Sequence, residues 1–210
     1  MKNLKQLDVS RLKVAIFIMI YDIIPYSAEK NLGRAYNQAI ALLPDGSHAC
    51  LRDGDTCWLT PDYGVHLAEY VRLYPNAVLT CWTNRINEKA EQQYKLEITL
   101  GLNLVRDDSN IKTHLELAKA VQDIGLYQTT PLHGFVSGFC MVVPKSIWNL
   151  HKFAEKQVYE DRGPHNLLGV DNDFTNRVRA GGVPVLRMDG LYIWHTYRLL
   201  TGDQDKKHLL

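Results

Sequence analysis

Val14-Ala-Ile-Phe-Ile-Met-Ile20 is apolar at every position and rich in β-branched and aromatic side chains. Such a run is typical of a β-strand that is covered on both faces, as strands of parallel sheets are. Asp22 and Pro25 follow the run, which places polar groups at the carboxyl end of the predicted strand. Open α/β sheets bind their ligands outside these strand ends. The sequence therefore predicts an α/β sheet with a ligand site at this edge.

Segments with helical and with strand periodicity alternate along the rest of the chain. Apolar residues at i, i+3 and i+4 spacing predict helices over 29–43 and 111–124. Start and stop signals predict two more, one that begins at Thr60-Pro61-Asp62 and runs to Leu73, and one over 171–180 that ends at Gly181-Gly182. Short apolar runs predict strands over 48–51, 77–83, 135–143, 184–187 and 191–194. We expect Thr60 to be an N-cap, Gly125 a C-terminal cap and Pro144 the start of a further helix. This alternation favours one three-layer α/β/α domain with a mixed, mainly parallel sheet.

The composition is that of an ordinary globular protein. Hydrophobic residues make up 46% and charged residues 22% of the chain, which excludes disordered, collagen-like and coiled-coil classes. The formal net charge is +1, with 24 basic and 23 acidic residues, so there is no overall basic field to hold a polyanion. We therefore do not expect nucleic acid as a partner, although a local basic patch is compatible with this balance.

The cysteine spacing and the lengths of the apolar runs indicate in which cellular compartment the protein is expected. The four cysteines have no CxxC spacing, and we expect reduced core thiols at Cys50, Cys57, Cys81 and Cys140. Basic residues precede the apolar run 14–20, but the run is short and Asp22 follows it, unlike a signal peptide. No stretch approaches the ~20 apolar residues of a transmembrane helix. We expect a cytoplasmic protein without a transmembrane segment.

Asp53-Gly54-Asp55 follows a predicted strand. Two carboxylates separated by one glycine form an oxygen-rich site that suits a hard divalent cation with open positions for phosphate. Glycine between them allows unusual backbone angles and close approach of a ligand. Taken alone, the motif is more often a surface turn.

Two further groups of polar residues could carry chemistry. Asp171-Asn172-Asp173 opens a predicted helix, where acidic side chains commonly act as caps. A carboxylate at a helix start in a cleft can also be a general base toward a sugar hydroxyl. His195 ends a predicted strand, and a histidine in that setting is usually held by hydrogen bonds, although it could also be a metal ligand. The chain has no GxxxxGK[ST], GxGxxG or GxSxG motif.

Taken in order, these segments resemble the family 2 glycosyltransferases over about residues 14–197. The segments that carry the resemblance are Asn31-Leu-Gly-Arg-Ala-Tyr-Asn37, Asp53-Gly54-Asp55, His133-Gly-Phe-Val-Ser-Gly-Phe-Cys-Met-Val-Val-Pro-Lys145, Gly169-Val-Asp-Asn-Asp-Phe-Thr-Asn-Arg-Val-Arg-Ala-Gly181 and His195. Asp53-Gly54-Asp55 falls at the place of the family's DXD motif. The resemblance implies a nucleotide-diphospho-sugar transferase-like domain over 1–210, with a nucleotide-binding part at about 14–83, an acceptor-side part at about 84–197 and a tail at 198–210.

The resemblance also implies site residues. Its metal ligands are Asp53, Asp55 and His195, and Asp171 has the position of the catalytic base. Asp22 takes the base-facing position, and substrate contacts fall on Asn31, Gly33, Arg34, Asn37, Asp53 and Gly138. The implied activity is transfer of a sugar from a UDP- or GDP-sugar, with UDP preferred, to an acceptor hydroxyl with Mn²⁺ or Mg²⁺ and with inversion. The class of the acceptor is open and includes a modified base.

Two departures from the family pattern keep other functions open. Val170 stands where the family usually has Glu, and only one strand is predicted before Asn31. A degenerate member that binds a sugar nucleotide or a protein partner without turnover is one alternative. A nucleotidyltransferase is another, although Asn31-Leu-Gly-Arg34 is a poor match to its glycine-rich basic turn. A glycoside hydrolase would use two carboxylates without a metal.

Overall fold

A computed structural model describes residues 18–29, 31–84, 86, 90–93, 110–155 and 169–196. In chain order the elements are β1 (Ile20–Ile23), α1 (Leu32–Ala41), β2 (His48–Arg52), β3 (Thr56–Trp58), α2 (Tyr63–Leu73), β4 (Val78–Thr83), α4 (Ile111–Gly125), β5 (Thr129–Pro131), β6 (Cys140–Pro144), α5 (Lys145–Leu150), α6 (Val170–Ala180) and β7 (Val185–His195). The fold is α/β, as predicted.

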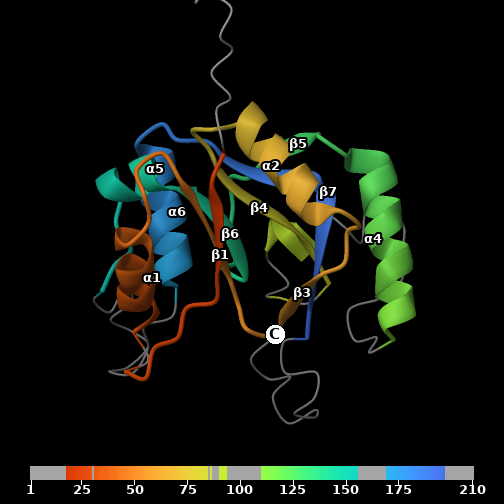
Figure 1. Cartoon of the computed structure of the whole chain (residues 1–210), viewed down its shortest axis with the longest axis horizontal. Coiled ribbons are helices and arrows are strands. Elements are labelled where there is room, and N and C mark those ends of the chain that lie inside the picture. Colours follow the sequence, from red (N-terminus) through yellow and green to blue (C-terminus); the bar gives the residue numbers. More distant parts are fainter. Residues whose placement is uncertain are drawn as a thin grey trace, which may run out of the picture.

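The strands form one mixed sheet in the order β1-β2-β6-β4-β7-β3, and β5 pairs with the other end of β7 (Figure 1). The pairs β1–β2 and β4–β7 are parallel, and β6 runs antiparallel to both of its neighbours, β2 and β4. Strands β3 and β5 are antiparallel to β7. Four of the seven strands therefore run in the same direction, which confirms a mixed, mainly parallel sheet.

Helices cover both faces of the sheet. Successive side chains of a strand point to opposite faces, so neighbouring residues of β2 belong to different hydrophobic clusters. Ala49 and Leu51 pack with α1, α5 and α6, whereas Cys50 packs with α2. Helix α4 packs against β7 (Figure 1), where it buries Trp82 of β4 and Tyr192 of β7.

The first strand differs from its prediction. Residues 14–17 lie outside the described part of the chain, and β1 begins at Ile20, so Asp22 lies within the strand. Its residues are half-buried or exposed, and β1 pairs only with β2 among the described strands. The prediction of a strand covered on both faces is therefore wrong for β1, because a strand at the sheet edge is only partly covered.

The structure gives three of the predicted strands different limits. Strand β6 begins at Cys140 rather than at 135, because the backbone N–H groups of Val136, Ser137 and Gly138 donate to side chains and not to a neighbouring strand. The two short strands predicted over 184–187 and 191–194 form the single strand β7. Its pairing with β4 shifts from Cys81–Met188 to Trp82–Tyr192, so the predicted interruption is a bulge.

Two residues that were predicted to be helix caps, Thr60 and Gly125, have other roles in the structure. Helix α2 begins at Tyr63 with Asp62 before it, whereas the Thr60 hydroxyl accepts from the backbone N–H of Tyr192 at 2.8 Å. Thr60 therefore joins the loop to β7 and is not an N-cap. Gly125 is the last residue of α4, and a Cβ there would collide with the backbone of Asp189. Close packing of helix and strand explains this glycine.

The four cysteines form no disulfide. Cys50, Cys81 and Cys140 are buried in strands, which confirms the prediction of core thiols for these three. Cys57 is exposed, because in β3 it points away from the side that partly buries Thr56 and Trp58.

The second residue of α1 and of α2 is a glycine, and the two differ in their surroundings. A Cβ at Gly33 would collide with the backbone carbonyl of Ala154, whereas a Cβ at Gly64 meets no heavy atom within 4 Å. We expect Gly33→Ala to lower the free energy of unfolding by about 2 kcal/mol or more through overpacking. Gly64→Ala should raise it by about 0.5 kcal/mol. Urea unfolding measures both, and equal effects would contradict this packing.

Candidate metal centre

The turn Asp53-Gly54-Asp55 joins β2 to β3 and is fixed at both ends. The backbone N–H and the hydroxyl of Thr56 donate to the Asp53 carbonyl at 3.3 and 2.7 Å. The N–H and hydroxyl of Thr196 donate to the Asp55 carbonyl at 3.0 and 3.1 Å. The predicted turn is confirmed, and its hydrogen bonds leave both carboxylates available to a ligand.

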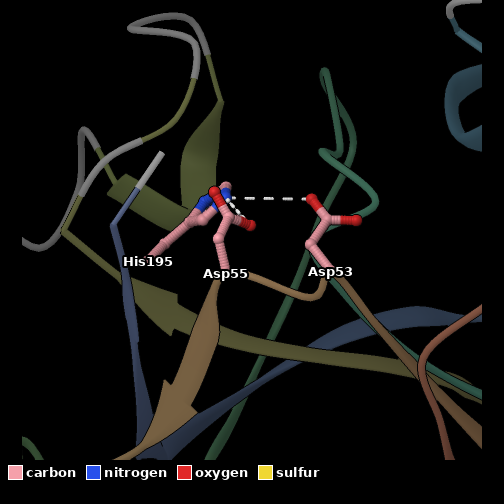
Figure 2. A group of neighbouring side chains, drawn as sticks. All are labelled: Asp53, Asp55 and His195. Atoms are coloured by element: carbon pink, nitrogen blue, oxygen red, sulfur yellow. Dashed lines mark ion pairs between the residues drawn. The ribbon is translucent and has the colours of Figure 1, made fainter. Parts of the chain in front are cut away.

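His195 lies opposite this turn, as the last residue of β7. Strand β3 pairs with β7 so that Thr56 and His195 are partners. Figure 2 shows both aspartates directed toward the imidazole: His195 Nε2 lies 3.2 Å from Asp55 Oδ1 and 3.8 Å from Asp53 Oδ2. The ligand atoms of all three residues lie within 4.8 Å of one another. The predicted metal residues therefore come together in space.

The imidazole of His195 is held by neighbours that the sequence did not identify. The backbone N–H of His195 donates to Asn84 Oδ1 at 2.8 Å, and the imidazole ring stacks on Phe139 with ring centroids 5.8 Å apart. The Phe139 carbonyl in turn accepts from the Asp53 N–H at 3.0 Å. Phe139 thus contacts both halves of the site, and such supporting contacts orient metal ligands.

The two carboxylates of the turn have opposite pKa shifts. Burial raises the pKa of Asp53, the charges of Asp55 and Asp171 add to this, and His195 opposes it. Burial also acts to raise the pKa of Asp55, but the hydrogen bond and the charge of His195 outweigh it, so the pKa is lowered. Negative charge is therefore concentrated here, and a cation would relieve the repulsion.

The donor set fits a divalent cation. Two carboxylate oxygens favour a hard cation such as Mg²⁺ or Mn²⁺, while an imidazole nitrogen favours a transition metal. The combination in Asp53, Asp55 and His195 favours Mn²⁺ over Mg²⁺. Asp53 and Asp55 remain partly exposed, with side-chain exposures of 40% and 43%, so a phosphate could reach a cation held there.

Asp171 is held by backbone groups at the start of α6 and by Gly138. It is in the first turn of α6, where its Oδ2 accepts from the Gly138 N–H at 2.7 Å and its Oδ1 accepts from the Asn172 N–H at 2.9 Å. Burial raises the pKa of Asp171, and these hydrogen bonds oppose the shift. The charge of Asp171 also raises the pKa of Asp53. Gly138, which holds Asp171, directly precedes Phe139, and Phe139 contacts both Asp53 and His195.

Gly138 holds Asp171 rather than facing open space. A Cβ at Gly138 would lie 2.9 Å from the Asp171 Cβ. The neighbouring acid, Asp173, forms an ion pair with Arg177 at 2.7 Å instead. Asp173 is therefore an ion-pair partner within α6. Asp171 is the residue of this cluster that accepts from a backbone N–H of the first helical turn, that of Asn172.

The predicted substrate residues of α1 lie together around residues 153–155. The Asn37 amide makes four hydrogen bonds, accepting from the Trp148 indole and the Phe153 N–H and donating to the Phe153 carbonyl and Glu155. Asn31 accepts from the Arg34 N–H and donates to the Glu155 carbonyl, and Arg34 pairs with Glu29 and Glu155. Together with Gly33, these contacts hold α1 in place. In the described part of the chain, no hydrogen bond or ion pair joins these residues to the metal centre.

Asp22 acts on the turn through Arg52. The Arg52 guanidinium binds both Asp22 oxygens, at 2.7 and 2.9 Å, and donates to Thr56 Oγ1 at 3.0 Å. The hydrogen bond to Asp22 raises the pKa of Arg52. Arg52 directly precedes the acidic turn in the sequence, and this adjacency was the signal that could have identified it.

Tyr36, like Arg52, is a residue that the sequence did not assign to the site. Its spacing predicted only a place on the apolar face of the helix over 29–43. It is 1% exposed. Burial raises its pKa well above the usual value, and the charges of Asp53 and Asp171 add to the shift. Its ring packs against Phe153 with centroids 4.7 Å apart, in the hydrophobic cluster that also contains Val170 at the start of α6.

The sequence matches no protein family model, and no curated protein matches it at a significant level. Within the described ranges, none of the helices combines the length and the apolar character needed to cross a membrane. The conclusions on function therefore depend on the geometry of the described residues.

Asp53→Asn should stabilise the metal-free protein at neutral pH. Because the folded state raises the pKa of Asp53, its carboxylate is destabilising above that pKa, and the penalty fades as the pH falls and the group is protonated. We expect a higher melting temperature for Asp53→Asn at pH 7 and a smaller difference near pH 4, measured with a chelator present. Asp62→Asn is the control, because Asp62 is exposed and Asn tolerates its left-handed backbone, φ 51°. A destabilised Asp53→Asn protein would contradict this electrostatic account.

Proposed function

We propose that the protein is a metal-dependent glycosyltransferase of the three-layer, nucleotide-diphospho-sugar transferase type. It moves a sugar from a UDP- or GDP-sugar to an acceptor hydroxyl. The observation that carries this proposal is the approach of Asp53, Asp55 and His195 to one another. Asp171 is linked to them through Gly138, the residue before Phe139, which contacts Asp53 and His195. The group follows the carboxyl ends of β2 and β7, where α/β sheets bind ligands.

The chain's own residues divide into two roles. Asp53, Asp55 and His195 would hold Mn²⁺, which when bound supplies charge neutralisation for the departing diphosphate. Asp171 takes the proton of the acceptor hydroxyl. The acceptor oxygen then forms the new bond to the anomeric carbon, while the bond from that carbon to the diphosphate oxygen breaks. A single displacement of this kind inverts the configuration.

The surroundings of Asp171 suit a general base. Burial makes its carboxylate more basic, and the Gly138 and Asn172 N–H groups fix its orientation. Oδ1 accepts from both the backbone and the side-chain N–H of Asn172, and Oδ2 accepts from Gly138. These bonds occupy three of about four lone-pair sites, so Oδ2 retains acceptor capacity. The carboxylate can therefore accept a proton without losing its anchoring contacts.

A nucleotidyltransferase is less well supported. That function requires a basic, glycine-rich turn for phosphate. Here Arg34 pairs with Glu29 and Glu155, and Gly33 packs against Ala154. The segment therefore serves the packing of α1.

Asp55→Asn should abolish metal-dependent nucleotide binding. We expect Mn²⁺ to increase the affinity of the wild-type protein for UDP or GDP, and the substitution to weaken metal-supported binding by more than about 100-fold, because even residues around metal ligands contribute 10–100-fold. Isothermal titration calorimetry with and without Mn²⁺ measures this. Asp62→Asn is the matched control, since Asp62 is exposed and Asn tolerates its left-handed backbone, φ 51°. If folded wild-type protein shows no metal-dependent nucleotide binding, the proposed function is wrong.

Asp171→Asn should separate binding from turnover. Loss of a general base should reduce kcat for donor hydrolysis, with water as acceptor, by about 10²–10⁴-fold, whereas the affinity for the Mn²⁺–nucleotide should stay close to the wild-type value. Asp173→Asn, in the same turn but paired with Arg177, should keep its kcat. Wild-type protein that binds donor without any turnover would favour the non-enzymatic alternative.

A further inference from the structure

Gln92 lies outside the helices and strands that the sequence predicts, and its side chain is fully buried. It is 0% exposed. Its amide oxygen accepts from the Ser137 N–H, and its amide nitrogen donates to the Ser137 carbonyl and to Thr80 Oγ1, each at 2.9 Å. The Thr80 hydroxyl donates in turn to the Cys140 carbonyl at 2.8 Å. Both amide donors of Gln92 are therefore used, and a rotation of the amide would leave buried polar groups unpaired.

The Gln92 amide takes the place of a neighbouring strand at Ser137. In an antiparallel sheet, two opposite residues exchange both of their N–H···O=C bonds. Gln92 makes the same pair of bonds to Ser137 with its side chain, because its oxygen accepts from the N–H and its nitrogen donates to the carbonyl. Strand β6 begins only at Cys140, three residues further on. Gln92 therefore holds the backbone at Ser137 ahead of the point where the sheet begins to hold it.

The backbone around Ser137 is held from two sides. The N–H groups of Val136 and Gly138 donate to side chains in the first turn of α6, at 3.1 and 2.7 Å. The Ser137 N–H between them donates to Gln92 instead. In an extended segment, successive N–H groups point to opposite edges, which is the alternation seen here. Gln92 therefore fixes one edge of this segment, while the first turn of α6 lies along the other.

The backbone next to Gln92 is itself anchored to the sheet. Arg187 of β7 donates to the Glu91 carbonyl at 3.1 Å. This arginine is 4% exposed, pairs with Asp189 at 2.7 Å, and lies with its guanidinium carbon 3.3 Å from the centroid of the Trp82 ring. A guanidinium held by an ion pair and an aromatic face has a fixed orientation. Gln92 is therefore a rigid support rather than a side chain on a loose loop.

We propose that Gln92 is a positioning residue for the general base Asp171. The inference rests on the proposed function and deepens it. Gln92 fixes Ser137, and the N–H of the next residue, Gly138, holds Asp171 Oδ2 at 2.7 Å. A Cβ at Gly138 would lie 2.9 Å from the Asp171 Cβ, so the backbone and the carboxylate are in close contact and move together. A misplacement of 1 Å in a catalytic group costs about 100-fold in rate.

Gln92→Met tests this role, because methionine has a similar length and volume but makes none of the three hydrogen bonds. Gln93→Met is the matched control, since Gln93 is also buried, at 2% exposed, and its amide oxygen accepts from the Ile86 N–H. Circular dichroism shows whether each variant is folded. If Gln92→Met does not fold, Gln92→Asn takes its place, because its amide is one methylene too short for the same contacts. NMR then follows the Gly138 amide against pH, with Asp171→Asn as the reference, and donor hydrolysis gives kcat and KM.

In the wild type, we expect the Gly138 amide resonance to titrate with Asp171, and Asp171→Asn to remove this titration. Gln92→Met should also remove it and should lower kcat about 100-fold with KM unchanged, whereas Gln93→Met should keep both properties. A Gly138 titration that Gln92→Met leaves unchanged, or an equal loss in the two glutamine variants, would overturn the positioning role even in an active enzyme. Wild-type protein without turnover would count against the proposed function, and the Gly138 titration would still decide the role of Gln92.

Discussion

The pairing of β3 with β7 is the constraint on which the candidate site depends. It places Thr56 opposite His195, while Thr56 holds the carbonyl of Asp53 and Thr196 holds that of Asp55. The acidic turn after β2 and the end of β7 are thereby fixed to each other, although β6 and β4 separate these strands in the sheet. Without this pairing, the two aspartates would form an ordinary surface turn.

The fold holds like charges close together at this point. The charges of Asp55 and Asp171 raise the pKa of Asp53 in addition to its burial, whereas His195 lowers it. Hydrogen bonds to the backbone keep the turn and Asp171 in position despite the repulsion. Such an arrangement is unfavourable for the empty protein and favourable for a bound cation, which is the pattern of a site selected for function at the expense of stability.

The sequence predicted the alternation of helices and strands and the residues that meet at the candidate site. Asp53 and Asp55 follow β2, Asp171 lies in the first turn of α6 and His195 ends β7. Each local pattern also fits a turn, a cap or a hydrogen-bonded histidine, so the order of the segments, and not any one motif, singled these residues out. Local patterns could not show that β1 is an edge strand, since an apolar run does not report its neighbours. They also could not show the role of Asn37, whose partners lie more than 100 residues away. Val170 illustrates a third case: it is 2% exposed within the core, so packing accounts for an apolar residue where the resembled family has Glu.

The most direct measurement is anomalous X-ray diffraction at the manganese edge from crystals grown with Mn²⁺ and a nucleoside diphosphate. Our account predicts one strong peak in direct coordination with carboxylate oxygens of Asp53 and Asp55 and with His195 Nε2, and with the diphosphate as a further ligand. A diphosphate bound away from this group, or manganese held elsewhere while these three residues bind none, would contradict it.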